Sequence, residues 1–151
     1  MAERAVILGD LTNPHEVQKL REYLIELYGF AGLRHQFSSV RTTDATVTTL
    51  VALPLEDNSS YHLTVSVVGR RTGGSSGAAG DSASYVRVGT FYRVSAGGAT
   101  QVGSTSTPHT AESQSGWECA LSTSGNDVLV RVTGASGNNL SWSGLITLQK
   151  V

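Results

Sequence analysis

Hydrophobic and polar residues along the chain change their spacing near residue 33. Before that point, one segment carries apolar residues three and four positions apart, as on one face of an α-helix. The residues of this stripe are Val17, Leu20, Leu24, Leu27 and Tyr28. Asn13 suits the N-cap, Pro14 the first helical position and Gly29 the C-terminal cap. The pattern predicts one amphipathic helix over residues 14–28.

After residue 33, apolar and polar residues alternate, as in strands that bury one face. The alternating segments are 61–67, 85–94, 117–122, 128–133 and 140–148, with weaker ones at 33–38, 45–53 and 99–104. Turn sequences such as Ser124-Gly125-Asn126-Asp127 separate the segments. The pattern predicts a mainly β protein whose residues 33–151 form an antiparallel β-sandwich or jelly-roll-like domain of about eight strands. A small barrel is the alternative.

Residues 1–32 differ from the β domain in spacing and carry a higher density of charge. Val6, Ile7 and Leu8 precede the helix and indicate a short strand or an extended arm. A segment this short does not fold alone, so its apolar residues must be buried against the β domain, a neighbouring subunit or another protein. We therefore expect residues 1–32 to form an arm and a helix that act as an assembly element.

Motifs for catalysis are nearly absent. The four histidines have no second ligand-type residue at metal-binding spacing, and no pair of acidic residues stands out as a general acid and base. Gly73-Gly74-Ser75-Ser76-Gly77 has the letters of a nucleophile elbow, but the residues after it would form a poor helix. Cys119, the single cysteine, is expected to be a small buried residue. We expect a protein that is not an enzyme and holds no cofactor or metal.

Charge and composition also limit the partners. The formal net charge is −1, which gives no overall attraction to nucleic acid or anionic lipid. No apolar run approaches the roughly 20 residues that span a bilayer. The first residues contain too short an apolar run for a signal peptide. We therefore expect neither a nucleic-acid nor a membrane partner, and synthesis in a cytosol.

Four arginines are candidates for an interface. Arg70 and Arg71 begin a glycine-rich stretch, residues 69–82, which is expected to be a long functional or disordered loop. Arg87 and Arg93 share a strand face with two aromatic residues, a combination found in nucleic-acid sites and at protein interfaces. The net charge favours a solvated or inter-subunit sheet face. The candidate interface residues are therefore Val6, Ile7, Leu8, Val17, Leu20, Leu24, Leu27, Arg70, Arg71, Arg87 and Arg93.

Several short motifs from Thr42 onward resemble a β domain of tailed-bacteriophage virion proteins. The motifs are Thr42-Thr43-Asp44-Ala45-Thr46, Val68-Gly69-Arg70-Arg71-Thr72, Ala83-Ser84-Tyr85-Val86-Arg87, Thr110-Ala111-Glu112-Ser113-Gln114-Ser115-Gly116-Trp117, Ser124-Gly125-Asn126-Asp127-Val128 and Val130-Arg131-Val132-Thr133-Gly134. The stretch that resembles this domain, from Thr42 to Val151, covers about 110 residues. The resemblance implies a structural protein on the surface of the virion, often trimeric, made in the cytoplasm of a host bacterium.

Two roles follow from the resemblance. The first is a capsid decoration or cement protein that docks on the head through its N-terminal arm. The second is a receptor-binding or fibre-tip module of the tail. A fibre usually has a shaft or a coiled-coil stem, and the sequence indicates neither, so decoration is the favoured expectation. In either role the expected partners are capsid or other virion proteins and further copies of the chain, as a trimer.

Overall fold

The computed structural model describes residues 14–28 and 33–151. The chain divides between Leu33 and Arg34 into two compact units. The first unit holds helix α1 (Pro14–Tyr28), which has the bounds predicted from the sequence. On α1, Gln18 Nε2 donates a hydrogen bond of 3.0 Å to Glu22 Oε1 one turn later. The arm residues Val6, Ile7 and Leu8, for which a strand was an expectation, lie outside the described residues.

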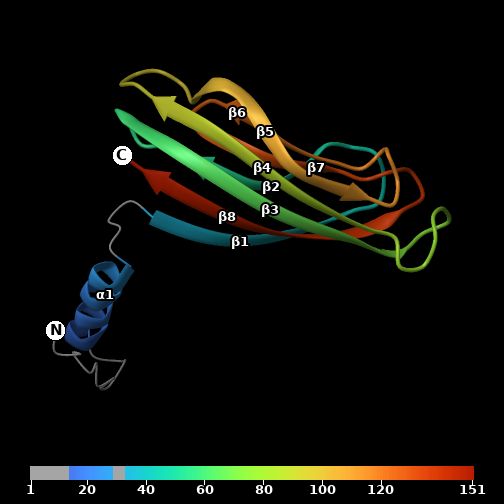
Figure 1. Cartoon of the computed structure of the whole chain (residues 1–151), viewed down its shortest axis with the longest axis horizontal. Helices are drawn as coiled ribbons and strands as arrows, with labels where there is room; N and C mark the ends of the chain where they lie inside the picture. Colours follow the sequence, from blue (N-terminus) through green and yellow to red (C-terminus); the bar gives the residue numbers. More distant parts are fainter. Residues whose placement is uncertain (1–13, 29–32) are drawn as a thin grey trace. The chain divides into compact units, whose positions relative to one another are not determined.

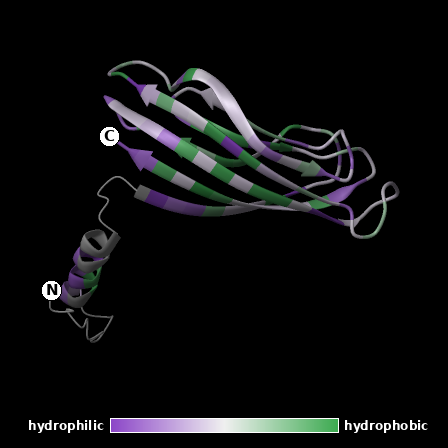
Figure 2. Ribbon diagram, viewed as in Figure 1, coloured by the Kyte–Doolittle hydropathy of each residue, from purple (hydrophilic) through white to green (hydrophobic). Residues whose placement is uncertain are grey.

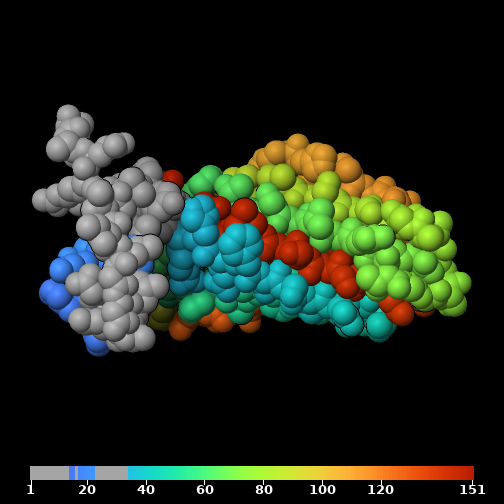
Figure 3. Space-filling view, turned by 90° about the horizontal axis from the view of Figure 1, so that it is seen from below, coloured from blue at the N-terminus to red at the C-terminus, as the bar shows by residue number. Residues whose placement is uncertain are grey.

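The second unit holds eight strands in two antiparallel sheets (Figure 1). The larger sheet has the order β1 (Leu33–Thr42), β8 (Asn139–Lys150), β3 (Ser59–Gly73), β4 (Ser82–Arg93) and β5 (Thr100–Glu112). The smaller sheet has the order β2 (Thr48–Pro54), β7 (Asp127–Thr133) and β6 (Glu118–Ser124). In Figure 3, β8 is seen in red between β1 and β3. The prediction of a mainly β sandwich with one short helix is confirmed.

Alternation along the strands fills the space between the two sheets. On β3, Leu63, Val65 and Val67 are buried while His62 and Ser66 are exposed. Figure 2 shows the same change between apolar and polar residues along β3, β4 and β8. The smaller sheet faces them with Val128, Val130 and Val132, which are completely buried. Strands β3, β4 and β8 therefore contribute every second side chain to one shared core.

Trp142 on β8 is the largest fully buried side chain of the core. Its indole N–H donates a 2.9 Å hydrogen bond to Thr42 Oγ1 at the end of β1. Trp117, which precedes β6, meets Trp142 edge to face with ring centroids 6.2 Å apart. Across the strand pair, Trp142 faces Gly69, which has no side chain to collide with the indole. The ring therefore joins both sheets, as expected from the sequence for two tryptophans on core faces.

The stretch 69–82 is not one long loop, contrary to the sequence-based expectation. Strand β3 continues to Gly73 and β4 begins at Ser82, which leaves a short connection. That connection is held by its own domain, because Ser76 N–H donates to Gly137 O at 2.9 Å. The glycines and serines of this stretch carry no alternation of apolar residues. Backbone pairing needs no side chain, so these residues extend the hairpin without a hydrophobic signal.

We predict that Gly69→Ala destabilises the β domain, because the new methyl group would overlap the six-membered ring of Trp142. Overpacking of this kind costs about 1–3 kcal/mol. Gly116→Ala is the matched control, since no atom lies within 4 Å of its added Cβ. Urea unfolding followed by tryptophan fluorescence measures both. Equal free energies of unfolding for the two variants would contradict the packing of Trp142 over Gly69.

Candidate functional site

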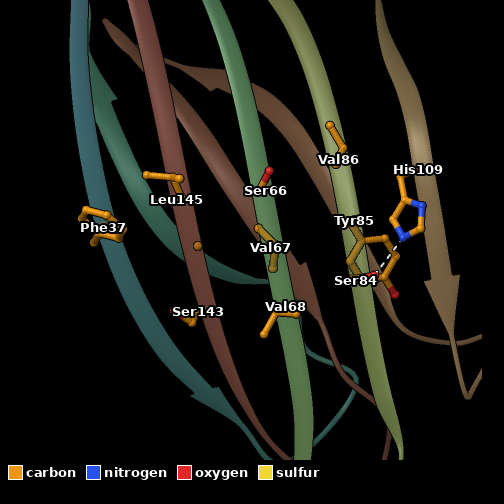
Figure 4. Close-up of a pocket in the computed structure, with 11 residues that line it drawn as sticks. Phe37, Ser66, Val67, Val68, Ser84, Tyr85, Val86, His109, Ser143 and Leu145 are labelled. Carbon is orange, nitrogen blue, oxygen red and sulfur yellow. Dashed lines mark hydrogen bonds between the residues drawn. The ribbon is translucent and has the colours of Figure 1, made fainter.

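A groove of about 300 Å³ crosses the outer face of the larger sheet (Figure 4). Five adjacent strands contribute to it, with β1 at one edge and β5 at the other. We call it the outer groove and define it by the outward-facing residues Phe37, Ser66, Val68, Ser84, Val86, His109, Ser143 and Leu145. Its volume is at the lower end of the range for small-molecule sites in proteins.

Apolar side chains on three neighbouring strands are exposed in the outer groove. Phe37 on β1 is 78% exposed, Leu145 on β8 37% and Val68 on β3 55%. All three line the same groove, and Val68 pairs with Ser143, two residues before Leu145 on β8. Single apolar residues on a surface are common, whereas a contiguous group marks an interaction surface.

Hydroxyl groups and one imidazole stand between these apolar side chains. Ser84 Oγ and His109 Nε2 are 2.9 Å apart and share a hydrogen bond that joins β4 to β5. Ser143 pairs with Val68 across β8 and β3, and Val68 pairs with Ser84 across β3 and β4. A serine hydroxyl both donates and accepts hydrogen bonds, so this row can bind hydrogen-bond donors as well as acceptors of a ligand.

The outer face of the larger sheet carries no carboxylate among its described residues. Strands β1, β3, β4 and β8 contain no aspartate or glutamate. The one acidic residue of the sheet, Glu112 on β5, accepts a 2.6 Å hydrogen bond from the hydroxyl of the buried Tyr85. Burial, followed by this bond, raises the pKa of Tyr85. Glu112 is therefore bonded to a core residue, and no carboxylate lines the outer groove.

Arg70 and Arg71 lie near the end of β3 and have different roles. Arg70 is exposed and pairs with Ser82 and Ser141, next to the outer groove. Arg71 points to the connection that follows β3. Its Nε donates to Ser76 O at 2.7 Å and its Nη2 to Gly74 O at 2.8 Å. The guanidinium of Arg71 is thus bonded to the connection after β3, whereas Arg70 is exposed on the outer face of the sheet.

Arg87 lies inside the sandwich, on the inner face of β4. It is 6% exposed and sits over the Tyr85 ring, 4.9 Å from its centroid. Its guanidinium donates to the carbonyls of Cys119 and His109 at 2.7 and 2.8 Å and to Thr110 Oγ1 at 3.0 Å. The solvated or inter-subunit sheet face expected around Arg87 is therefore wrong, because the guanidinium replaces water with backbone carbonyls.

Arg93 fixes the turns at the opposite end of β4. Its Nη1 donates to Leu55 O at 2.9 Å and its Nε to Gly97 O at 3.0 Å. Its Nη2 forms an ion pair of 2.8 Å with Asp57. These bonds join the turn after β2 to the turn after β4, so the side chain is engaged within its own domain.

The apolar candidates of the N-terminal segment lie on α1 or before it. Val17 is 46% exposed and Leu20 is half-buried. Leu24 and Leu27 belong to the same helix. Their role in an interface stays a prediction. Val6, Ile7 and Leu8 lie outside the described residues.

Cys119 is a core residue, and the described residues form no metal-binding cluster. Cys119 is 2% exposed, and burial raises the pKa of its thiol to about 11, so it is an unreactive core residue as expected. Within residues 14–28 and 33–151, no group of three histidine, cysteine or acidic side chains lies close enough to hold a metal ion. No helix in these two ranges is long and apolar enough to cross a membrane.

Sequence reasoning did not identify the outer groove. Alternation placed Val68 and Leu145 on outward positions, since their neighbours Val67 and Ile146 belong to the core. Apolar residues at outward positions of adjacent strands were the available signal. The signal becomes a site only when β1, β8 and β3 are known to be neighbours, and β1 and β8 lie about a hundred residues apart in the sequence.

Comparisons with known proteins find a similar fold in part of a phage tailspike. No protein-family model and no curated protein matches the chain. The solved tailspike of Acinetobacter baumannii phage AM24 matches with a TM-score of 0.52 at 9% identity, over 78% of this chain and 26% of that one. The tailspike of Acinetobacter phage vB_ApiP_P1 matches with a TM-score of 0.40 at 16% identity, over 79% and 22%. This chain thus spans about a quarter of the tailspikes that it matches.

These comparisons correct two expectations from the sequence. A third match, the tailspike of Acinetobacter baumannii bacteriophage Fri1, is described as a capsular polysaccharide depolymerase, with a TM-score of 0.36, 10% identity and coverage of 85% and 23%. The expectation of a non-enzymatic protein is contradicted by the tailspike matches, among which the AM24 tailspike shares the fold over 26% of its length. Capsid decoration finds no support, and the match to part of the AM24 tailspike fits the tail alternative better.

We predict that Asp81 titrates below its ordinary pKa of 3.8, because its carboxylate accepts hydrogen bonds from Ala78 N–H and Gln114 Nε2. A lowered pKa stabilises the connection after β3 above pH 3.8, and this stabilisation is lost as the pH falls through the folded-state pKa. The Ala78 amide signal in NMR should report that transition. Asp81→Asn should abolish it, and Asp57→Asn should leave it unchanged. A midpoint at or above 3.8 would contradict the prediction.

Proposed function

We propose that the chain is a module of a phage tail appendage and that its outer groove binds a saccharide of the host surface. The fold supports the first half of this proposal, since the β domain matches part of the AM24 tailspike with a TM-score of 0.52. The chemistry of the outer groove supports the second half. The observation that carries it is an exposed aromatic ring next to a row of hydroxyl groups on a sheet face without carboxylates.

Phe37 gives the groove a surface for the apolar side of a sugar ring. A sugar ring presents C–H bonds on its faces and hydroxyl groups around its edge. The Phe37 ring is 78% exposed, so a sugar can pack against it without displacing other side chains. Val68 and Leu145 extend the same apolar surface across two further strands.

Ser66, Ser84 and Ser143 would meet the edge of the sugar. Each sugar hydroxyl donates and accepts hydrogen bonds, and a serine hydroxyl can act as the acceptor or the donor in return. His109 is held by Ser84 at 2.9 Å, which fixes the imidazole at the β5 side of the groove. A rigid strand scaffold limits the entropy that these side chains lose when a ligand binds.

Charge allows neutral and acidic sugars in the outer groove. The neighbouring strands hold no carboxylate, and Arg70 is exposed next to the groove. An acidic sugar would therefore meet no repulsion and could lie close to one cation. In this proposal the protein acts on the virion, with other virion proteins and further copies of the chain as partners.

We predict that Phe37→Ala weakens saccharide binding about tenfold, because a good aromatic contact is worth about 0.5–1.5 kcal/mol beyond its buried area. The measurement is retention of the purified chain on immobilised surface polysaccharides from a panel of Acinetobacter strains, followed by titration on the retained one. Val68→Ala should also weaken binding. Its matched control is Val47→Ala, because Val47 is 54% exposed, almost as much as Val68, and lies outside the groove.

Three results would oppose the proposal. Retention on no polysaccharide of the panel would contradict saccharide recognition. Equal affinity of Phe37→Ala and the unchanged chain would remove the outer groove from the site. Equal losses for Val68→Ala and Val47→Ala would show that the loss is not specific to the groove.

A further inference from the structure

Two exposed arginines lie on the outer face of the larger sheet, next to the outer groove. Arg70 on β3 pairs with Ser141 on β8. The alignment of β1 with β8 follows from His35 Nδ1 and Thr147 Oγ1, which share a hydrogen bond of 3.2 Å. Six residues further along each of these antiparallel strands lie Arg41 and Ser141. We call Arg41, Ser141 and Arg70 the arginine row.

The spacing of the strands lets both guanidinium groups reach one ligand. Arg41 and Arg70 stand on strands that are separated only by β8, so their Cα atoms are about 10 Å apart. An extended arginine side chain covers half of this distance, and both groups can therefore meet above Ser141. The serine hydroxyl between them adds one more hydrogen-bond donor. The arginine row thus suits a group that accepts several hydrogen bonds.

Neither guanidinium is used within the described part of the chain. Both arginines are exposed, and among residues 14–28 and 33–151 none forms a hydrogen bond or an ion pair with either of them. The acids that follow these strands have other partners. The Asp44 carboxylate accepts the Thr46 N–H at 2.7 Å, and Asp81 Oδ2 accepts two hydrogen bonds of 2.9 and 2.7 Å. An anion between the two arginines would relieve the repulsion of their like charges.

We infer that the arginine row binds an anionic group, a carboxylate or a phosphate, carried by the saccharide that lies in the outer groove. This inference rests on the proposed saccharide function and restricts it to acidic saccharides. A guanidinium group matches either anion through paired N–H donors. Val68 and Ser143 of the groove lie two residues from the row on β3 and β8, about 7 Å away. A sugar in the groove can therefore place its acidic substituent at the row.

Charge at the row would make the site selective. A neutral saccharide leaves both guanidinium groups in water, whereas an acidic one gains hydrogen bonds that are about twice as strong as neutral ones. Two arginines beside the exposed apolar ring of Phe37 favour one acidic substituent over a polyanion such as nucleic acid. Salt screens exposed charges, so we expect the affinity to fall as the ionic strength rises.

The first test uses monosaccharides that share one ring and differ in charge. The isotope-labelled full chain is titrated with glucuronate, glucose phosphate and glucose, and NMR follows the Nε–H signals of Arg41 and Arg70. Both signals should follow one saturation curve with at least one acidic sugar, which identifies carboxylate or phosphate, and should not move with glucose. Arg41→Gln should weaken the response of Arg70 about tenfold. No response to either acid, or an equal response to glucose, would overturn the inference.

The second test uses the polysaccharide that the unchanged chain retains. Arg70→Gln should lower the affinity about tenfold at low salt. Arg34→Gln is the matched control, because Arg34 is also exposed but lies at the other end of β1, where it donates to Gln36. Neither substitution touches the core, so both variants should keep the melting temperature of the unchanged chain.

The outcomes of the second test separate the two proposals. A loss with Phe37→Ala but equal affinities for Arg70→Gln and Arg34→Gln would overturn the anionic site and keep the saccharide proposal. Retention of no polysaccharide, together with shifts of Arg41 and Arg70 in the first test, would contradict polysaccharide recognition and support anion binding at the row.

Discussion

The packing of Trp142 between the two sheets is the constraint on which the rest of the β domain depends. One indole contacts Trp117 from the smaller sheet and lies over Gly69 of β3. Its N–H reaches Thr42 and so fixes the end of β1. Tyr85, with its ring centroid 6.4 Å from that of Trp142, extends the same cluster to β4. Strands that are far apart in the sequence are thereby held side by side. The same strand order determines which side chains are neighbours on the outer face of the larger sheet.

Arg87 shows how a charge can support this core without an acidic partner beside it. Its guanidinium reaches carbonyls on β5 and just across the interface on β6, and it stacks on Tyr85. Tyr85 in turn donates to Glu112, which brings the carboxylate to the same region. Hydrogen bonds to a charged donor are about twice as strong as neutral ones, and they offset part of the cost of removing the guanidinium from water. The inner face of β4 therefore holds one buried charged side chain, Arg87, whose position is fixed by hydrogen bonds.

The inner and outer faces of the larger sheet have divided roles. Large aromatic and aliphatic side chains hold the sandwich from the inside, while the outer groove combines Phe37 with small hydroxyl residues. The AM24 tailspike shares the fold over 26% of its length, so the fold itself leaves the activity open.

The sequence by itself determined most of the elements and the faces of most strands. The helix over residues 14–28, the eight strands and the burial of Trp117, Trp142 and Cys119 follow from local periodicity, because a side chain's direction repeats every 3.6 or 2 residues. Only the tertiary structure decided which strands are neighbours and which face of β4 is inside. Arg87 could not be placed by its type, since its burial depends on carbonyls from two distant strands. The outer groove likewise exists only because β1 and β8 pair across the length of the domain.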